Sequence, residues 1–383
     1  MSTTDRSNVT VRITNKIIFL SQKVKLDIKS FLTRMRQRKL LIADYSPTIQ
    51  KLIMFLTPGF DNVNGGIISI TSLYNETHKI RNVLGAEVIM CTAPGEPNLI
   101  RFSKFDNQNY LYDMQQALSY FTNLNCLMIH IPEYAVGRFV AAIGETRRER
   151  FQEIGDVRFN ILLQNIGFVP NSLDIDILKK IGKVTCTTAH ESYSKEDLER
   201  RLGVRLRYLS WYVSLQDYEK QDYREKSNLL VVSNDPHPRK KEILSFMRTS
   251  IPNLEIRVIK DIHYDEYRKL IARAKWTLTF GEGLDGYFLE TVFAGGISFA
   301  VYNTEFFTDD FRGLKTVYHS WDELKHRICS DIESLDNASE YAAYNAKLYD
   351  VCNRHYNPEI YRKGIDDFYA AEWKSSEPHA NQF

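Results

Sequence analysis

The sequence predicts an α/β protein of two domains, each built around a parallel β-sheet. Short apolar segments alternate with longer, partly polar segments along most of the chain, which is typical of strands separated by helices. The alternation is interrupted at the polar and charged stretch 214–228, SLQDYEKQDYREKSN, which indicates a linker. The chain of 383 residues is also longer than one hydrophobic core usually serves.

The composition indicates a soluble globular protein. Hydrophobic residues make up 43% of the chain and charged residues 26%. Because the formal net charge is only +2, we expect no nucleic acid as a partner. The five cysteines are widely spaced without a C-x-x-C pair, which favours free thiols in a reducing cytoplasm. Residues 1–10 are polar and no apolar run is long enough to span a membrane, so we expect a cytoplasmic protein without a signal peptide.

A basic segment over residues 1–45 precedes the first domain. Between 15 and 42 it reads NKIIFLSQKVKLDIKSFLTRMRQRKLLI, with many Lys and Arg and with Asp27 as its acidic residue. The apolar residues recur at roughly helical spacing, although alternation over 24–28 also allows a short strand. A basic amphipathic helix here could lie on an anionic membrane surface, contact a partner enzyme, or pack on the domain with its basic face in solvent.

The first domain is predicted over residues 46–213. An apolar strand, a glycine-containing loop and an apolar helix open it, which is how an α/β unit begins. Further strands and helices then alternate. The predicted strands are 52–56, 86–93, 125–134, 157–170 and 184–190. One predicted helix begins at residue 67, and two others cover 111–123 and 136–143.

The second domain is predicted over residues 228–345, where the strand–turn–helix pattern starts again. An amphipathic helix over 264–274 leads to a buried strand over 276–280. Three glycines within six residues then mark a tight turn, a helix covers 287–294, and Gly295-Gly296 ends it before a strand over 297–302. The remaining residues, 346–383, are predicted to be helical around Pro358.

Two glutamates mark the first candidate site, in GEGLDGYFLE. Glu282 lies in the glycine turn and Glu290 in the following helix. Ligands of parallel sheets bind at the carboxyl ends of strands, and helix N-termini attract phosphate. Eight helical residues span roughly 12 Å, which suits two contacts along an extended ligand better than two ligands of one metal. The alternative is a solvated Glu282 and a Glu290 on the helix surface.

Three further segments offer polar groups at strand ends. The turn SNDPHPRKKE (233–242) presents His237 and basic side chains that could neutralise a diphosphate. The loop NVNGG (62–66) allows close backbone approach, and His130 ends an apolar strand, where a structural role is the alternative. Asp174 and Asp176 resemble a metal motif, but they stand at a probable helix start, so we expect no metal site. Walker, zinc and nucleophile-elbow motifs are absent from the sequence.

These features together resemble the GT-B glycosyltransferases of the retaining Glu-x7-Glu class, over about residues 50–375. The flanking GEGLDGYFLE is also similar to bacterial polysaccharide-assembly transferases, including rhamnosyltransferases. The resemblance implies two Rossmann-like domains facing across a cleft, an acceptor domain first and a donor domain second. It also implies that helices in 346–383 return to the first domain.

The resemblance assigns roles to residues at matching positions. Glu290 would bind the donor ribose and Glu282 the donor sugar, with His130 of the first domain near that sugar. The diphosphate would meet the turn after the first strand of the second domain, although the usual Gly-Arg turn is replaced here by Asn-Asp-Pro-His-Pro. The expected catalytic residues are Glu282, His130 and Arg239, and the expected donor-binding residues are Glu290, Lys240, Lys241, Asn64, Gly65, Gly66, Gly283, Leu284, Asp285, Gly286 and Tyr287.

The implied activity is transfer of a hexosyl or deoxyhexosyl group from a nucleotide diphosphate with retained configuration. The implied acceptor is a glycan or lipid-linked oligosaccharide of bacterial surface polysaccharide, such as O-antigen of lipopolysaccharide or capsule. Neither a metal nor another cofactor is expected. The protein would act in the cytoplasm or at the inner face of the membrane. One alternative is a catalytically inactive scaffold or binding subunit. Another is a sugar-nucleotide epimerase or a phosphorylase, although a phosphorylase needs a pyridoxal-binding lysine and none is evident in the sequence.

Overall fold

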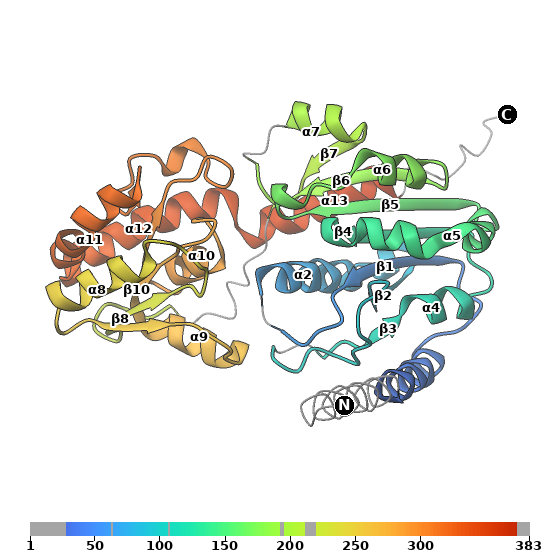
Figure 1. Ribbon diagram of the computed structural model, residues 1–383, viewed down its shortest axis with the longest axis horizontal. Helices are drawn as coiled ribbons and strands as arrows, with labels where there is room; N and C mark the ends of the chain where they lie inside the picture. Colours follow the sequence, from blue (N-terminus) through green and yellow to red (C-terminus); the bar gives the residue numbers. More distant parts are fainter. Residues whose placement is uncertain (1–27, 63, 106–107, 192–194, 211–219, 374–383) are drawn as a thin grey trace, which may run out of the picture.

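The computed structural model describes residues 28–62, 64–105, 108–191, 195–210 and 220–373. It contains two parallel sheets with helices around them, which confirms the predicted two-domain α/β class (Figure 1). The predicted linker lies partly in 211–219, outside the described residues, as do residues 1–27 of the basic segment. In the part of the chain that is described, no helix has the length and apolar character needed to cross a bilayer.

The first sheet has seven parallel strands in the order β3-β2-β1-β4-β5-β6-β7. β1 (Lys51–Thr57) pairs with β2 on one side and with β4 on the other. The strands are β1 (Lys51–Thr57), β2 (Glu87–Thr92), β3 (Leu111–Asp113), β4 (Cys126–Pro132), β5 (Asp156–Leu163), β6 (Lys183–Thr188) and β7 (Arg205–Tyr208).

Helices cover both faces of this sheet, so its central strands are buried on both sides. Leu52 and Met54 of β1 enter one core, and Ile53 and Phe55 enter the other, because neighbouring side chains point to opposite faces. The first core holds α4 (Met114–Tyr120), α5 (Val136–Gln152), α6 (Ser172–Lys179) and α7 (Lys195–Leu202); the second holds α2 (Gly65–Lys79), α3 (Arg81–Leu84) and α13 (Pro358–Glu372).

One predicted helix of this domain was partly wrong. Residues 111–123 do not form a single helix: Leu111–Asp113 is the edge strand β3, which pairs with the end of β2. The carboxylate of Asp113 then accepts a hydrogen bond from the Gln116 amide and caps α4. In α5, Gly144 adopts a positive φ of 49°, so the regular helix ends where the prediction placed its end, at residue 143.

The second sheet has five parallel strands in the order β12-β11-β10-β8-β9, and one core surrounds it. Its strands are β8 (Ser227–Val232), β9 (Glu255–Val258), β10 (Ala274–Leu278), β11 (Ile297–Val301) and β12 (Val317–Tyr318). Its helices are α8 (Lys240–Ser250), α9 (Tyr264–Arg273), α10 (Gly286–Phe293), α11 (Trp321–Leu335) and α12 (Ala338–His355). The sequence patterns around 276–302 predicted the β10–α10–β11 unit within two residues at each boundary.

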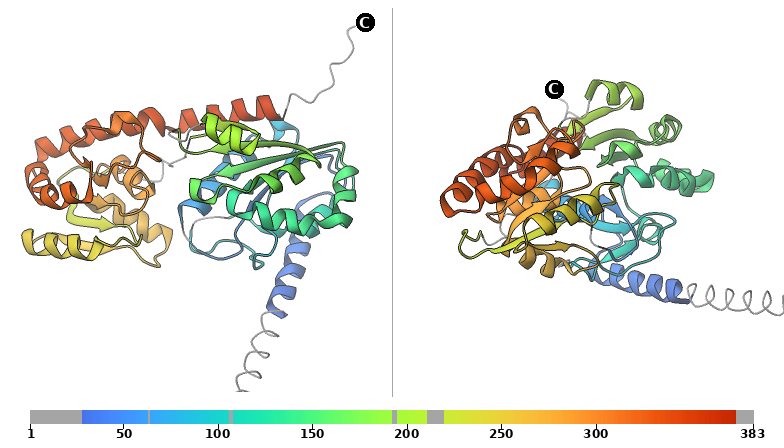
Figure 2. Two further views of the ribbon diagram at one scale, coloured as in Figure 1. Left: turned by 45° about the horizontal axis from the view of Figure 1, so that its top comes forward. Right: turned by 60° about the vertical axis from the view of Figure 1, so that its left-hand side comes forward.

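The last helix returns to the first domain. α13 follows α12 directly, and Figure 2 shows the pair running from the second domain along the first. Tyr361, Ile365 and Phe368 lie in the core on the α2 face of the first sheet. Glu372 at its end forms ion pairs with Arg207 (2.6 Å) and Lys183 (2.7 Å). The helix that ends the second domain is therefore part of the first domain's hydrophobic core.

Direct contacts also join the two domains along the edge that carries the strand ends. The Tyr264 amide at the start of α9 donates to the Lys104 carbonyl (2.9 Å), and its ring packs against both cores. Across the same boundary, His355 of α12 pairs with Glu191 (3.4 Å). All five cysteines are free and buried within the two domains.

Trp373 provides a test of how much α13 contributes to stability. Its ring is buried and its indole N–H donates to the Leu84 carbonyl (2.9 Å). We expect Trp373→Ala to lower the free energy of unfolding by about 3–5 kcal/mol, because a large buried ring and a hydrogen bond are lost. Chemical denaturation followed by circular dichroism measures this. The control Ile360→Ala changes a side chain on the exposed side of α13 and should lower the free energy of unfolding much less. If both variants lowered it equally, burial of the Trp373 ring would not be what stabilises the docking of α13.

Candidate functional site

The turn between β10 and α10 is held by its own backbone and by the neighbouring loop. The Thr279 hydroxyl donates to the Gly283 carbonyl (2.9 Å). Gly283 has φ of 88°, and a Cβ there would lie 2.6 Å from the Phe307 ring, so this position requires glycine. Asp285 then caps α10 by accepting a hydrogen bond from the Phe288 amide (3.0 Å), which aims the helix N-terminus at the end of the strand.

The turn after β8 lies against the turn after β10. The Phe280 amide donates to the Ser233 hydroxyl (3.0 Å), and a Cβ on Gly281 would be 2.9 Å from the Asp235 carboxylate. Parallel pairing of β8 with β10 brings the carboxyl ends of both strands to one edge. The two turns therefore lie at the same edge of the second sheet.

The three predicted basic residues of this turn have different surroundings. Lys240 lies closest to the glycine turn: its ammonium group donates to the carbonyls of Ser233 (2.5 Å) and Asp235 (3.0 Å), and burial lowers its pKa. Lys241 is exposed on the first turn of α8. Arg239 forms ion pairs with Glu242 and with Asp322 of α11, so its guanidinium group is engaged on the outer side of the turn.

The two glutamates face different neighbours. Glu290 is 5% exposed, and its carboxylate accepts a hydrogen bond from the Tyr264 hydroxyl of α9 (3.4 Å). Glu282 is half-buried and contacts the Asn165 amide of the first domain (3.5 Å). Burial, followed by the nearby charge of Asp235, raises the pKa of Glu282 to about 7. The carboxylates are therefore arranged as two separate contacts, one beside α9 and one at the domain boundary.

Two first-domain residues at this boundary were not predicted. The backbone amide of Asn165 donates to Glu133 (3.2 Å), while its side-chain amide reaches Glu282. Glu133 is 5% exposed, and its second carboxylate oxygen has no hydrogen-bond partner within the described residues. Burial raises the pKa of Glu133 to about 7, and the charge of Glu282 adds to the effect. The predicted strand over 157–170 would contain Asn165, but β5 ends at Leu163, so Asn165 follows the strand's carboxyl end.

The predicted glycine loop of the first domain lies at the corresponding edge of its own sheet. Asn64 caps α2 by accepting a hydrogen bond from the Ile67 amide (2.9 Å). A Cβ on Gly66 would come within 2.9 Å of the Gln164 side chain, whose amide donates to the Gly66 carbonyl. Gly65 is exposed, and a Cβ there would meet nothing within 4 Å, so this residue leaves an open approach to the helix start.

His130, which the resemblance places near the donor sugar, is buried within the first domain. Its ring is 1% exposed and stacks on Phe55 at 4.2 Å between centroids. The Asn160 amide donates to Nδ1 (3.0 Å), so Nε2 carries the proton and donates to the Tyr369 hydroxyl of α13 (2.9 Å). Burial lowers the pKa of His130 to about 3. His130 is therefore a neutral residue that ties the first sheet to α13.

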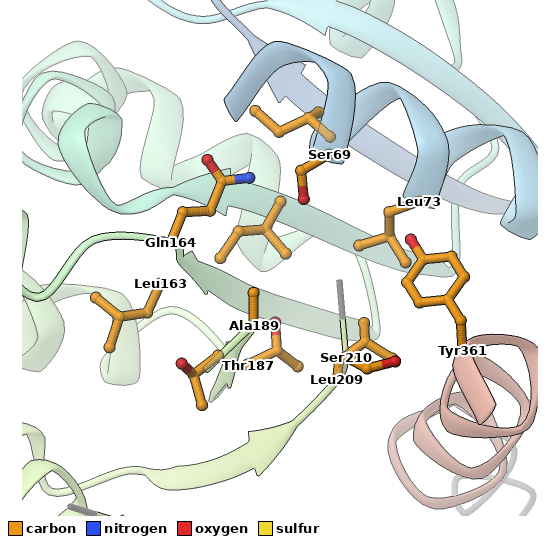
Figure 3. A pocket seen from close by; sticks show the side chains of 12 residues that line it. Ser69, Leu73, Leu163, Gln164, Thr187, Ala189, Leu209, Ser210 and Tyr361 are labelled. Carbon is orange, nitrogen blue, oxygen red and sulfur yellow. The ribbon is translucent and has the colours of Figure 1, made fainter. Parts of the chain in front are cut away.

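A small pocket lies beside this site at the carboxyl ends of β5 and β6 (Figure 3). It has a volume of about 30 Å³, enough for one water molecule, and α2 and α13 contribute Ser69 and Tyr361 to its wall. The Ser210 hydroxyl in its wall is buried without a hydrogen-bond partner among the described residues. The pocket therefore offers an unused hydroxyl at the same sheet edge as Gln164.

The described residues contain no group of three or more His, Cys, Asp or Glu side chains placed to hold a metal ion. The Asp174 and Asp176 pair belongs to α6, where Asn171 caps the helix by accepting from the Leu173 and Asp174 amides. That arrangement matches the helix-start interpretation of these acidic residues.

Solved structures share the architecture, whereas no protein-family model and no curated protein sequence matches the chain. The structure of Anabaena Alr3699/HepE in complex with UDP superposes on this chain with a TM-score of 0.51 and 9% sequence identity. The superposition covers 84% of this chain and 100% of that one. Sucrose-phosphate synthase of Thermosynechococcus elongatus gives 0.52 at 10% identity, over 85% and 100%. TarM gives 0.58 at 9%, over 85% and 100%. These neighbours have the GT-B architecture, and the chain adopts that fold.

The buried carboxyl of Glu133 predicts a measurable pH dependence of stability. Its pKa is near 4.5 when unfolded and about 7 when folded, so the folded state binds the proton more tightly. The free energy of unfolding should therefore fall as the pH rises from about 4.5 to about 7. Glu133→Gln removes this loss, and we expect it to be more stable than the wild type by roughly 2 kcal/mol at about pH 8, with the difference disappearing near pH 4.

Chemical unfolding of both proteins across this pH range measures the effect. The exposed Glu333, changed to Gln, serves as the control and should leave the pH profile unchanged. Parallel profiles for wild type and Glu133→Gln would show that Glu133 is not desolvated in the folded protein.

Proposed function

We propose that the chain is a glycosyltransferase that moves a sugar from a nucleotide diphosphate donor to a glycan or lipid-linked acceptor. One observation carries the proposal: the glycine turn and the N-terminus of α10 lie between Glu290, beside α9, and Glu282, beside the first domain. A nucleotide sugar has hydroxyl groups on both sides of its diphosphate. The UDP bound to the HepE neighbour supports a nucleotide as the ligand.

In this proposal Glu290 binds the ribose and Glu282 the transferred sugar. The backbone from Gly283 to Tyr287 approaches the diphosphate at the start of α10, where the helix dipole favours negative charge. Asn64, Gly65 and Gly66 approach it from the first domain. The open position at Gly65 and the N-terminus of α2 support this second contact.

A diphosphate donor would bind beside several carboxyl groups, so its negative charge has to be offset by a basic side chain. Asp235 and Asp285 are close to Glu282, and burial raises the pKa of Asp285 well above its ordinary value. A diphosphate would add further negative charge there. We propose that Lys240 exchanges its carbonyl contacts for a phosphate oxygen, because charge-assisted hydrogen bonds are the stronger ones. Arg239 would follow only by leaving Asp322 and Glu242.

The finer features of the activity are part of the proposal. Transfer proceeds with retention and without a metal, the acceptor hydroxyl attacking the anomeric carbon while the departing diphosphate takes its proton. The sugar is a hexose or deoxyhexose such as rhamnose, and the product is a bacterial surface polysaccharide such as O-antigen or capsule.

A binding or scaffold subunit is the second candidate. Of the three predicted catalytic side chains, His130 is buried and Arg239 is paired with Asp322. Such a protein would bind the nucleotide sugar without consuming it, and turnover separates the two candidates.

The first experiment measures thermal stabilisation by a panel of nucleoside diphosphates in the presence of EDTA. A ligand at about 100 times its Kd should add about 2.7 kcal/mol to the free energy of unfolding. We expect Glu290→Gln to lose the shift, because its ribose contact is weakened, and the exposed control Glu333→Gln to keep it.

The matching nucleotide sugar is then incubated with the protein and a panel of glycan and lipid-linked acceptors, and release of the nucleoside diphosphate is followed. Release that Glu282→Gln abolishes supports the transferase. Binding without release supports the scaffold. A folded wild type that no nucleotide stabilises would overturn the assignment of the donor site.

A further inference from the structure

The N-terminal helix, residues 28–44 of the described chain, has two different faces. One face attaches it to the first domain: Gln37 donates to the carbonyls of Leu99 and Leu111 (3.0 Å each), and Leu41 is buried in the core. Arg34 pairs with Asp113 (3.4 Å) on the same side. Since these residues are spaced by three or four, they form one stripe along the helix. The attachment therefore uses a largely polar face.

The apolar face of the helix is exposed. Ile28, Phe31, Leu32 and Met35 follow one another at helical spacing, and each is exposed, Phe31 by 63% and Leu32 by 60%. Burial of apolar side chains normally drives a surface helix to pack with this face inward. Here it faces outward along a helix that projects from the domain in both views of Figure 2. This outer face, Ile28–Phe31–Leu32–Met35, requires a covering that the described chain does not supply.

The charge of the N-terminal helix indicates which kind of partner would bind its apolar face. Residues 28–44 contain five basic residues, Lys29, Arg34, Arg36, Arg38 and Lys39, and one acidic residue, Asp44, which accepts a hydrogen bond from the Tyr112 hydroxyl of the first domain. Lys29 and Arg36 also border a hollow of about 360 Å³ whose apolar wall is made by Ile28, Leu32 and Ile100. An apolar wall with a cationic rim matches an anionic amphiphile, which has hydrocarbon below a negative headgroup. A neutral protein surface would leave this positive charge without a counterpart.

We propose that the outer face of the N-terminal helix binds an anionic phospholipid membrane, with Phe31 and Leu32 entering the acyl boundary and the surrounding Lys and Arg contacting headgroup phosphates. Helices of this type lie in the plane of the interface, and each basic residue near it adds electrostatic attraction. The polar attachment through Gln37 would then hold the first domain at the surface. This inference is independent of the proposed function, since it needs no nucleotide.

The test uses the full chain and two kinds of vesicle, phosphatidylcholine alone and phosphatidylcholine mixed with phosphatidylglycerol. We expect sedimentation with the anionic vesicles only, reversed at high salt because the attraction is screened. Phe31→Ser combined with Leu32→Ser should abolish binding, and Arg36→Gln combined with Lys39→Gln should weaken it about tenfold or more. The matched control, Val83→Ser with Leu173→Ser, removes two equally exposed apolar side chains elsewhere and should bind like the wild type.

Insertion itself is read from the fluorescence of a Leu32→Trp variant, which should shift to shorter wavelength with anionic vesicles. No binding to anionic vesicles, or binding that the Phe31→Ser and Leu32→Ser changes leave intact, would overturn the proposal. So would an oligomer, detected by light scattering without lipid, that the same changes dissociate, because a second copy would then be what covers this face. Stabilisation by nucleoside diphosphates should be unchanged in all of these variants.

Discussion

The arrangement of the two domains depends on the docking of α13 into the core of the first domain. Its aromatic and aliphatic side chains fill the α2 face of the first sheet, and the chain reaches them only after completing the second domain. The hydrophobic burial of this one helix therefore fixes where the second sheet can stand. The contact of Asn165 with Glu282 and that of Lys104 with Tyr264 are smaller, and they form where α13 has already brought the two edges together.

Local patterns predicted the elements of the second domain closely, whereas the hydrogen-bond partners of single side chains could not be predicted from them. The β10–α10–β11 unit and the shared edge of the two turns followed from apolar runs, glycines and parallel pairing. The contact of His130 with α13 could not be predicted from the sequence. A strand buried on both faces gives no sign of which face packs against which helix, and Tyr369 is 239 residues away in the sequence. The ion pair of Arg239 with Asp322 could not be predicted for the same reason, since Asp322 comes from α11.

The candidate site combines a favourable backbone with unfavourable charge. The start of α10 attracts anions, but Asp235 and Glu282 stand beside it, and Glu133 approaches from the first domain. Burial, and after it the repulsion from neighbouring carboxylates, raises the pKa of Glu282 and of Glu133 to about 7. Perturbed carboxyl groups of this kind gather at functional sites more often than elsewhere. Protonation of either glutamate would reduce the negative charge that an anionic ligand meets.

The burial of every cysteine has a practical consequence for following the motion of the two domains. The thiolate is the reactive form of cysteine, and burial raises the pKa of each of these thiols. Maleimide dyes should therefore react slowly with the natural chain under native conditions. One new cysteine on each domain, at exposed positions such as Val83 and Phe246, would carry a fluorophore pair without removal of the natural five. The separation of the dyes would then report directly whether the sheets approach each other.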